Sequence, residues 1–270
     1  MVALSREAPI GVFDSGIGGL TVVRELVRQL PGERIIYFGD TARVPYGPKS
    51  PDTVQRYSRE IASFLQGEGV KALVVACNTA TAHALPMLQR ELTLPVIGVV
   101  EPGARAAVGA SPTHRIGVIG TAGTVASGAY ERAIRALAPE AQVTARACPL
   151  FVPLVEEGWL DAPATRLIAE EYLAPLQGGH VDTLVLGCTH YPLLKPLLAD
   201  VMGRDVRLID SAEQTAAATA RVLAERELCA PAGAPTTHRF VASDAPEQFL
   251  RLAQRFLGTP IDGVEKITLG

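Results

Sequence analysis

The chain has 270 residues, 20% of them charged, and a formal net charge of -3. That length accommodates one large domain or two compact lobes with a substantial core. The near balance of acidic and basic residues argues against a broad basic surface and against a polybasic membrane patch. We therefore expect a small polar substrate and no nucleic-acid or membrane partner.

The N-terminal segment does not resemble a signal peptide. It is short and contains Arg6 and Glu7 without an apolar core. No later window reaches the roughly 20 apolar residues that span a bilayer. These features lead us to expect a cytoplasmic protein.

The first part of the chain alternates between predicted strands and helices. Strands that alternate with helices indicate a mainly parallel sheet covered on both faces. Apolar, partly β-branched runs predict strands at 10–13, 34–38, 71–76 and 96–100, and three- and four-residue spacing of apolar residues predicts helices at 20–30, 51–65 and 81–92.

Two glycine-containing loops interrupt this alternation. The turn 14–19 follows the first strand, and its backbone N–H groups could hold an anion at the start of the next helix. It is not a dinucleotide fingerprint, because Thr21 stands where the third glycine of G-x-G-x-x-G would fall. The loop 39–48 is too rich in glycine and proline to be a helix or strand, and such loops often carry function.

From Arg115 the same pattern starts again. Three pairs of landmarks, Gly11 with Gly117, Cys77 with Cys188 and Glu101 with Ser211, lie 106, 111 and 110 residues apart by subtraction of their positions. This constant order predicts an α/β protein with two similar, mainly parallel lobes related by pseudo-two-fold symmetry. The elements expected in the second half are strands at 116–119, 183–187 and 206–210, a helix around 130–137, a loop at 148–158 and a helix at 164–176.

The tail after Ser211 has a pattern of its own. It predicts a helix to 227, a loop at 230–235, a strand at 238–242, a helix at 246–257 and a last strand at 264–269, which must pair somewhere.

The four cysteines are far apart and form no C-x-x-C pair, which argues against a disulfide framework and a zinc site. Cys77 and Cys188 each stand at the end of an apolar run, with hydroxyl or amide side chains next in sequence. Ligands of open α/β sheets bind beyond the carboxyl ends of the strands. If the lobes face each other, one thiol can remove a proton from a carbon while the other supplies one to the opposite face.

Five motifs together resemble the cofactor-independent glutamate racemases, within the two-cysteine aspartate/glutamate racemase family, over residues 10 to 211. They are Asp14-Ser15-Gly16-x-Gly18-Gly19, Gly39-Asp40-Thr41-x-x-x-Pro45-Tyr46-Gly47, Ala76-Cys77-Asn78-Thr79-Ala80, Glu101-Pro102-Gly103 and Gly187-Cys188-Thr189-His190-Tyr191-Pro192.

The resemblance implies an isomerase that interconverts L- and D-glutamate, without pyridoxal phosphate or metal, and supplies D-glutamate for peptidoglycan. It implies an active site in the cleft between a lobe made of 1–99 with the returning tail 211–270 and a second lobe, 100–210. The resemblance also leads us to expect a homodimer.

The resemblance also assigns roles to residues. Cys77 is expected to take the proton from D-glutamate and Cys188 from L-glutamate. Asp14 and His190 match supporting groups, and Glu156 matches a further carboxylate. Substrate contacts are expected from residues of the same motifs, together with Thr121: Asp14, Ser15, Pro45, Tyr46, Gly47, Cys77, Asn78, Thr79, Thr121, Cys188, Thr189 and His190.

Structural roles stay open beside these functional ones. Asp14 could cap its turn, and Asn78, Thr79 and Thr189 could cap helices while still contacting a ligand. Asp40 and Glu101 could brace loops, and Glu157 could take the place of Glu156. Cys148 and Cys229 are expected to be packing or surface residues, and Trp159 a core or interface anchor.

Three other functions remain as alternatives. One is a two-cysteine racemase acting on aspartate or a hydantoin, and another is a binding protein with inert cysteines. The third, a pyridoxal enzyme, would need one of only four lysines to form its Schiff base: Lys49, Lys71, Lys195 or Lys266.

Overall fold

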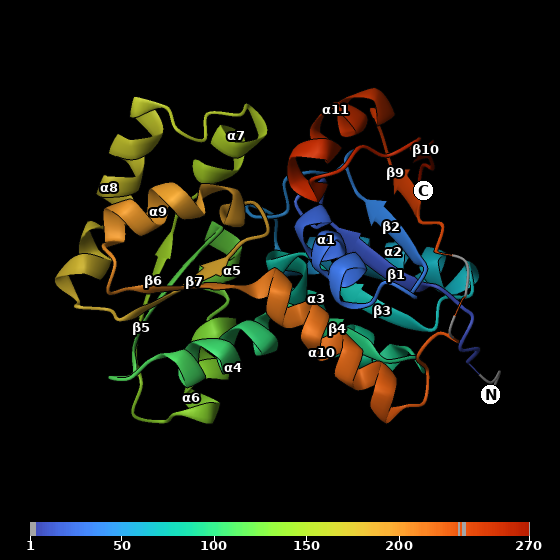
Figure 1. Cartoon of the computed structure of the whole chain (residues 1–270), viewed down its shortest axis with the longest axis horizontal. Helices are drawn as coiled ribbons and strands as arrows, with labels where there is room; N and C mark the ends of the chain where they lie inside the picture. Colours follow the sequence, from blue (N-terminus) through green and yellow to red (C-terminus); the bar gives the residue numbers. More distant parts are fainter. Residues whose placement is uncertain (1–3, 232, 234–235, 270) are drawn as a thin grey trace.

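The computed structural model describes residues 4–231, 233 and 236–269, so three residues of the expected loop 230–235 lie outside the described part. Two parallel sheets lie side by side, each flanked by helices (Figure 1). The strands are β1 (Ile10–Asp14), β2 (Ile35–Gly39), β3 (Ala72–Val75), β4 (Val96–Gly98), β5 (Arg115–Gly120), β6 (Gln142–Ala147), β7 (Thr183–Gly187), β8 (Arg207–Asp210), β9 (Arg239–Ala242) and β10 (Glu265–Lys266).

The helices alternate with these strands through most of the chain. They are α1 (Leu20–Gln29), α2 (Pro51–Gly67), α3 (Asn78–Glu91), α4 (Val100–Ala110), α5 (Ala122–Ala126), α6 (Ala129–Leu137), α7 (Phe151–Glu156), α8 (Pro163–Gly178), α9 (Lys195–Met202), α10 (Ser211–Glu225) and α11 (Pro246–Leu257), with a 3₁₀ turn η1 (Tyr191–Leu194). None of the helices in the described ranges is long and apolar enough to cross a membrane.

The two sheets share one strand order. The first runs β10-β9-β2-β1-β3-β4 and the second β6-β5-β7-β8, so the order 2-1-3-4 occurs in both. All of the pairings are parallel, and parallel strands end at the same edge of a sheet. The predicted two-lobed α/β fold is therefore confirmed, and the last strand of the tail pairs with β9 at the edge of the first sheet.

Both faces of the first sheet are buried, as its apolar strands predict. Val12 packs with the helices α1 and α11 on one face, whereas its neighbour Phe13 packs with α2 and α3 on the other. Side chains alternate across a strand, and each fully buried aliphatic or aromatic one contributes roughly 1.5–3 kcal/mol. The division of the chain at 99/100 and 210/211 stays a prediction.

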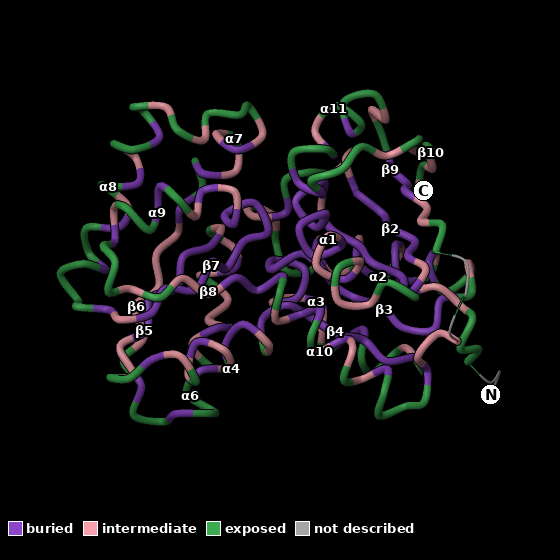
Figure 2. Tube along the Cα trace, in the orientation of Figure 1, coloured by how far each residue is buried: buried purple, intermediate pink, exposed green. Residues whose placement is uncertain are grey.

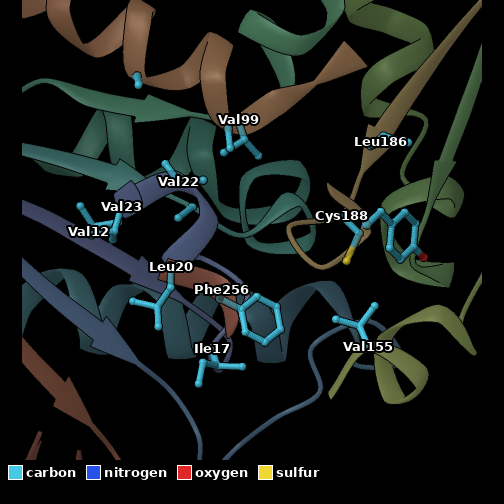
Figure 3. Close-up of a cluster of buried hydrophobic side chains, with 14 of the residues drawn as sticks. Val12, Ile17, Leu20, Val22, Val23, Val99, Val155, Leu186, Cys188 and Phe256 are labelled. Atoms are coloured by element: carbon cyan, nitrogen blue, oxygen red, sulfur yellow. The ribbon is translucent and has the colours of Figure 1, made fainter. Parts of the chain in front are cut away.

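Apolar packing continues from one sheet to the other. One cluster joins Leu20 and Phe256 from the elements of the first sheet with Val155 and Leu186 from those of the second (Figure 3). Figure 2 shows the buried chain along the central strands of both sheets and exposed segments at the periphery. Trp159 lies outside the core with an exposed fraction of 53%, so of the two roles expected for it the core role is wrong, and the interface role stays a prediction.

Several local expectations differ from the structure. The loop expected at 148–158 contains the short helix α7, and the strand expected to reach Val100 stops at Gly98, where α4 soon begins. The edge strand β6 and the helix α9 were not predicted. The N-terminus of α2 follows the prediction, with Ser50 as N-cap accepting the Thr53 N–H at 3.3 Å.

Candidate active site

The carboxyl ends of the strands of both sheets meet at one narrow cavity of about 30 Å³. Asp14 is the last residue of β1, Cys77 follows β3, Thr121 follows β5 and Cys188 follows β7. All twelve residues expected to contact substrate line this cavity, together with Val44 and Val152: Asp14, Ser15, Pro45, Tyr46, Gly47, Cys77, Asn78, Thr79, Thr121, Cys188, Thr189 and His190.

Cys77 is held at the N-terminus of α3. Its Sγ accepts the Ala80 N–H at 3.4 Å and lies 3.7 Å from Ser15 Oγ. A helix N-terminus favours a thiolate, yet burial and the Asp14 carboxyl outweigh it and raise the pKa of Cys77 to about 12. The resting form at this position is therefore the neutral thiol, a proton donor.

Asp14 both caps the turn after β1 and faces the cavity. Its Oδ2 accepts the Gly19 N–H at 2.7 Å, and its Oδ1 lies 3.4 Å from Ser15 Oγ. Burial raises the pKa of Asp14, while the nearby His190 and the bond from Gly19 act in the opposite direction. The capping role and a place beside Cys77 thus coexist in one side chain.

Cys188 belongs to a chain of three polar groups. His190 Nδ1 lies 3.9 Å from Cys188 Sγ, and His190 Nε2 lies 2.8 Å from Glu156 Oε1. Burial lowers the pKa of His190, but its hydrogen bonds to Cys188 and Glu156 outweigh burial and raise it to about 10. Glu156 contacts His190 and does not itself line the cavity. Of the two adjacent glutamates, Glu156 and Glu157, it is Glu156 that bonds to His190.

The hydroxyl and amide groups are fixed across the boundary between the sheets. Thr79 Oγ1 lies 2.9 Å from Thr121 Oγ1. Tyr130 donates its hydroxyl to Asn78 Oδ1 at 2.7 Å, whereas Asn78 Nδ2 is buried and has no partner among the described residues. A buried N–H without a partner is costly, and Asn78 lines the cavity, so this amide is suited to a ligand acceptor.

Backbone approaches bring the two halves together at the cavity. The Gly123 N–H donates to Gly47 O at 2.9 Å, and Thr21 donates its hydroxyl to Thr189 O at 3.1 Å. A Cβ on Gly18 would lie 2.4 Å from His190 Nδ1, so only glycine allows this approach. Figure 3 shows Cys188 and Val155 on one side of this boundary and Ile17 and Phe256 on the other.

Other candidates from the sequence lie elsewhere. Asp40 is buried behind the loop that carries Tyr46, and Glu101 is exposed on α4, paired with Arg105. Cys148 is buried in the core, where burial raises its pKa to about 12. Among the described residues that line the cavity there is no lysine or arginine. The arrangement can therefore offer two thiols, hydroxyl and amide hydrogen-bond donors and one imidazole to a small ligand.

Sequence reasoning missed four residues of the site. Val44 and Val152 line the cavity, Tyr130 orients Asn78, and Phe256 packs edge-on against the His190 ring with centroids 5.1 Å apart. Val44 falls within a loop that the sequence singled out. The other three carry no local signal, because their roles depend on contacts made by distant elements.

Comparison with known proteins gives one consistent result. Residues 10–220 match the family model described as Asp/Glu/Hydantoin racemase. The chain is 55% identical over 260 residues to a glutamate racemase of Geobacter metallireducens, covering 96% of both chains. It is also 55% identical over 261 residues to one of Syntrophus aciditrophicus, covering 97% of both.

Solved structures agree with the sequence comparison. A glutamate racemase isoform of Bacillus anthracis superimposes with a TM-score of 0.94 at 44% identity, over 98% of both chains. The Francisella tularensis glutamate racemase in complex with D-glutamate gives 0.92 at 39% identity, again over 98% of both. An aspartate racemase of Picrophilus torridus shares the fold alone, with a TM-score of 0.55 at 19% identity over 82% of this chain and 99% of that one.

Proposed function

The chain belongs to the Asp/Glu/hydantoin racemase family, and from this premise we propose that it interconverts L- and D-glutamate by proton transfer between two cysteines. The observation that carries the proposal is the placement of Cys77 and Cys188, from different sheets, in the lining of one buried cavity. Stereoinversion needs a proton acceptor on one face of the α-carbon and a donor on the other.

The two thiols start in unequal environments. Cys77, whose pKa is raised to about 12, is a proton donor at rest. The protonated His190 stands 3.9 Å from Cys188 Sγ and places a positive charge beside it. In the direction from L-glutamate, as the family relationship suggests, Cys188 takes the α-proton, and Cys77 delivers its own to the other face to give D-glutamate. For D-glutamate the two cysteines exchange roles.

The polar lining suits an amino acid with two carboxylates. Asn78 Nδ2 offers an N–H to a carboxylate oxygen, and the hydroxyls of Thr79, Thr121 and Thr189 offer further hydrogen bonds. In a buried site such fixed dipoles stabilise developing charge at the α-carbon without reorganisation of water. The small cavity volume also excludes bulk water from the carbanion-like transition state.

The alternative functions are less well supported. The four glutamate racemases described above are 39–55% identical to the chain, whereas the aspartate racemase is 19% identical. A pyridoxal enzyme needs a lysine at the site, but Lys71 is bonded to Glu33, Lys195 to Asp210 and Lys266 to Asp244, and Lys49 is not in the lining. A binding protein with inert cysteines is less well supported because the relatives matched over nearly the whole chain are glutamate racemases.

We place this activity in the supply of D-glutamate for peptidoglycan, as the family relationship suggests. The cytoplasmic location and the homodimer expected from the sequence also stay proposals. Size-exclusion chromatography with light scattering would distinguish a homodimer from a monomer.

The activity test uses polarimetry or circular dichroism of L-glutamate incubated with the purified protein. We expect Cys77→Ser and Cys188→Ser each to lower racemisation by roughly 10²–10⁴-fold, the usual worth of a general acid or base. Cys229→Ser is the matched control, since this cysteine lies outside the cavity lining. Turnover like that of the wild type in either active-site variant would rule out the two-base mechanism.

Substrate choice needs its own measurement. Deuterium incorporation at Cα from heavy water, followed across a panel of amino acids, should occur with glutamate and not with aspartate or a hydantoin. Exchange into aspartate alone would overturn the choice of substrate while leaving the two-cysteine chemistry in place.

A further inference from the structure

The loop 40–50 between β2 and α2 contributes Pro45, Tyr46 and Gly47 to the cavity lining, yet it contains neither helix nor strand. Its conformation is therefore not set by the hydrogen bonds of secondary structure. A loop of this kind must be held by side chains if its backbone is to present fixed groups to a ligand.

Asp40 is the side chain around which this loop is built. It has an exposed fraction of 0% and accepts hydrogen bonds from three different residues. Ser243 Oγ donates to its Oδ1 at 2.9 Å, Arg43 Nε donates to its Oδ2 at 2.8 Å, and the Tyr46 hydroxyl donates to its Oδ2. A buried polar network whose members are all hydrogen-bonded makes the structure around it more rigid.

The partners of Asp40 connect the loop to its surroundings. Ser243, at the end of β9, also accepts the Ala42 N–H at 2.8 Å, which joins the loop to the tail of the chain. Arg43 is shared between Asp40 and Glu60 and lies over the Tyr57 ring at 4.1 Å.

The network reaches the site in two directions. The Asp40 N–H donates to Asp14 O at 3.0 Å, next to the cavity, and the carbonyl of Gly47 receives the Gly123 N–H from the second half. The Tyr46 side chain is buried and lines the cavity, and its hydroxyl donates to Asp40. Tyr46 thus joins the cavity lining to a group of residues outside it, Asp40, Arg43 and Ser243.

We propose that Asp40 is a positioning residue, which fixes the backbone of Pro45–Gly47 in its substrate-binding form before glutamate enters. The expected effect on kinetics rests on the proposed glutamate racemisation, whereas the expected effect on the conformation of the loop does not. A preformed loop lowers the entropic cost of binding. Loosening it should weaken the binding of both enantiomers equally, because both occupy the same cavity.

The kinetic test compares Tyr46→Phe and Ser243→Ala with Tyr57→Phe. Tyr46→Phe removes one hydroxyl donor from Asp40 and keeps the packing, and Ser243→Ala removes another together with the acceptor of the Ala42 N–H. Tyr57→Phe removes a hydroxyl from the neighbouring ring, 5.7 Å from that of Tyr46, and spares Asp40. We expect KM for L- and for D-glutamate to rise about tenfold in the first two, with kcat changed less than twofold, the pattern of lost uniform binding. Tyr57→Phe should keep the KM of the wild type.

Amide hydrogen exchange of the free protein gives a readout that does not depend on activity. The amides of Tyr46, Gly47 and Lys49 should exchange at least tenfold faster in Tyr46→Phe and Ser243→Ala than in the wild type and in Tyr57→Phe. Asp40→Asn, if it folds, should show the largest change in both readouts. Unchanged exchange in Tyr46→Phe and Ser243→Ala would overturn the assignment of Asp40. Accelerated exchange in a protein without racemase activity would instead overturn the proposed function alone.

Discussion

The imidazole of His190 joins a cysteine to a carboxylate, and its charge should set the alkaline limit of activity. Its pKa is raised to about 10, since hydrogen bonds to Cys188 and Glu156 outweigh burial. Glu156→Gln removes an anionic partner, so the pKa of His190 should fall toward its ordinary value of about 6.5. We therefore expect the alkaline limb of the kcat/KM profile to move to lower pH by roughly one unit or more. A pH titration of the initial racemisation rate measures it.

The neighbouring carboxylate provides the control for that measurement. Glu157 is exposed and adjacent to Glu156, so Glu157→Gln changes the same net charge without touching His190. Its profile should superimpose on that of the wild type. A shift in Glu157→Gln without one in Glu156→Gln would mean that the wrong member of the pair has been assigned.

At the residue scale, most of the site could be predicted. Every residue that the family resemblance nominated as a substrate contact lines the cavity, and strand-end geometry alone would have indicated Asp14, Cys77 and Cys188. Tyr130 and Phe256 could not be predicted in the same way. Each acts on a site residue far from it in sequence, Asn78 and His190 respectively, and no local pattern encodes such a contact.

At the scale of elements, the predicted helices and strands were wrong where a residue departed from the usual sequence pattern of a helix start or of a strand. The helix expected from Thr81 begins at Asn78, because the Cys77 thiol accepts the cap N–H that Ser, Thr, Asp or Asn usually takes. The helix α4 was hidden by Pro102, which lies in its first turn, where no N–H partner exists. The edge strand β6 is partly exposed and carries too few apolar residues to be recognised.

Two turns that approach each other give a sharp test at this scale. Gly18, between β1 and α1, leaves no room for a Cβ, which would lie 2.4 Å from both His190 Nδ1 and Thr189 Oγ1 after β7. Gly18→Ala must therefore displace the β7 turn from the cavity. Since a misplacement of about 1 Å can cost roughly 10²-fold in rate, we expect kcat to fall by about that factor. Steady-state racemisation in both directions measures the loss.

A second glycine substitution separates this steric effect from a general one. Gly32 follows α1, and a Cβ there would meet nothing within 4 Å. Gly32→Ala should retain the kcat of the wild type. If Gly18→Ala also retained it, the close approach of the two turns would have no role in catalysis.

At the scale of the whole molecule, the spacing of motifs in the sequence could not predict that the two sheets face each other across one cavity. The repeated alternation of strands and helices was foreseeable from repeated motifs, but the distance between the lobes is set by contacts such as Gly47 with Gly123 and Thr79 with Thr121. These contacts are made by glycine and threonine residues, which are common in loops, so nothing in the local sequence marks them as contacts between the lobes. Their effect depends on complementary positions in both halves of the chain at once.

The apolar cluster shared by both sheets predicts that the molecule unfolds as one unit. Leu20 and Phe256 from the first sheet's elements and Leu186 from the second all belong to it, so separating the sheets would expose buried surface from both. Trp159, the only tryptophan, lies between α7 and α8 and reports on the second half. In urea, its fluorescence and the far-ultraviolet circular dichroism of the whole chain should change at the same midpoint.

A core substitution tests whether that coupling is real. Leu186→Ala in the fully buried strand β7 should cost roughly 2–5 kcal/mol. If the sheets unfold together, both midpoints should fall by the same amount, because the lost packing belongs to the common cluster. An earlier transition in Trp159 fluorescence alone would show that the second sheet unfolds independently, and the boundaries at 99/100 and 210/211 would then mark units that fold separately.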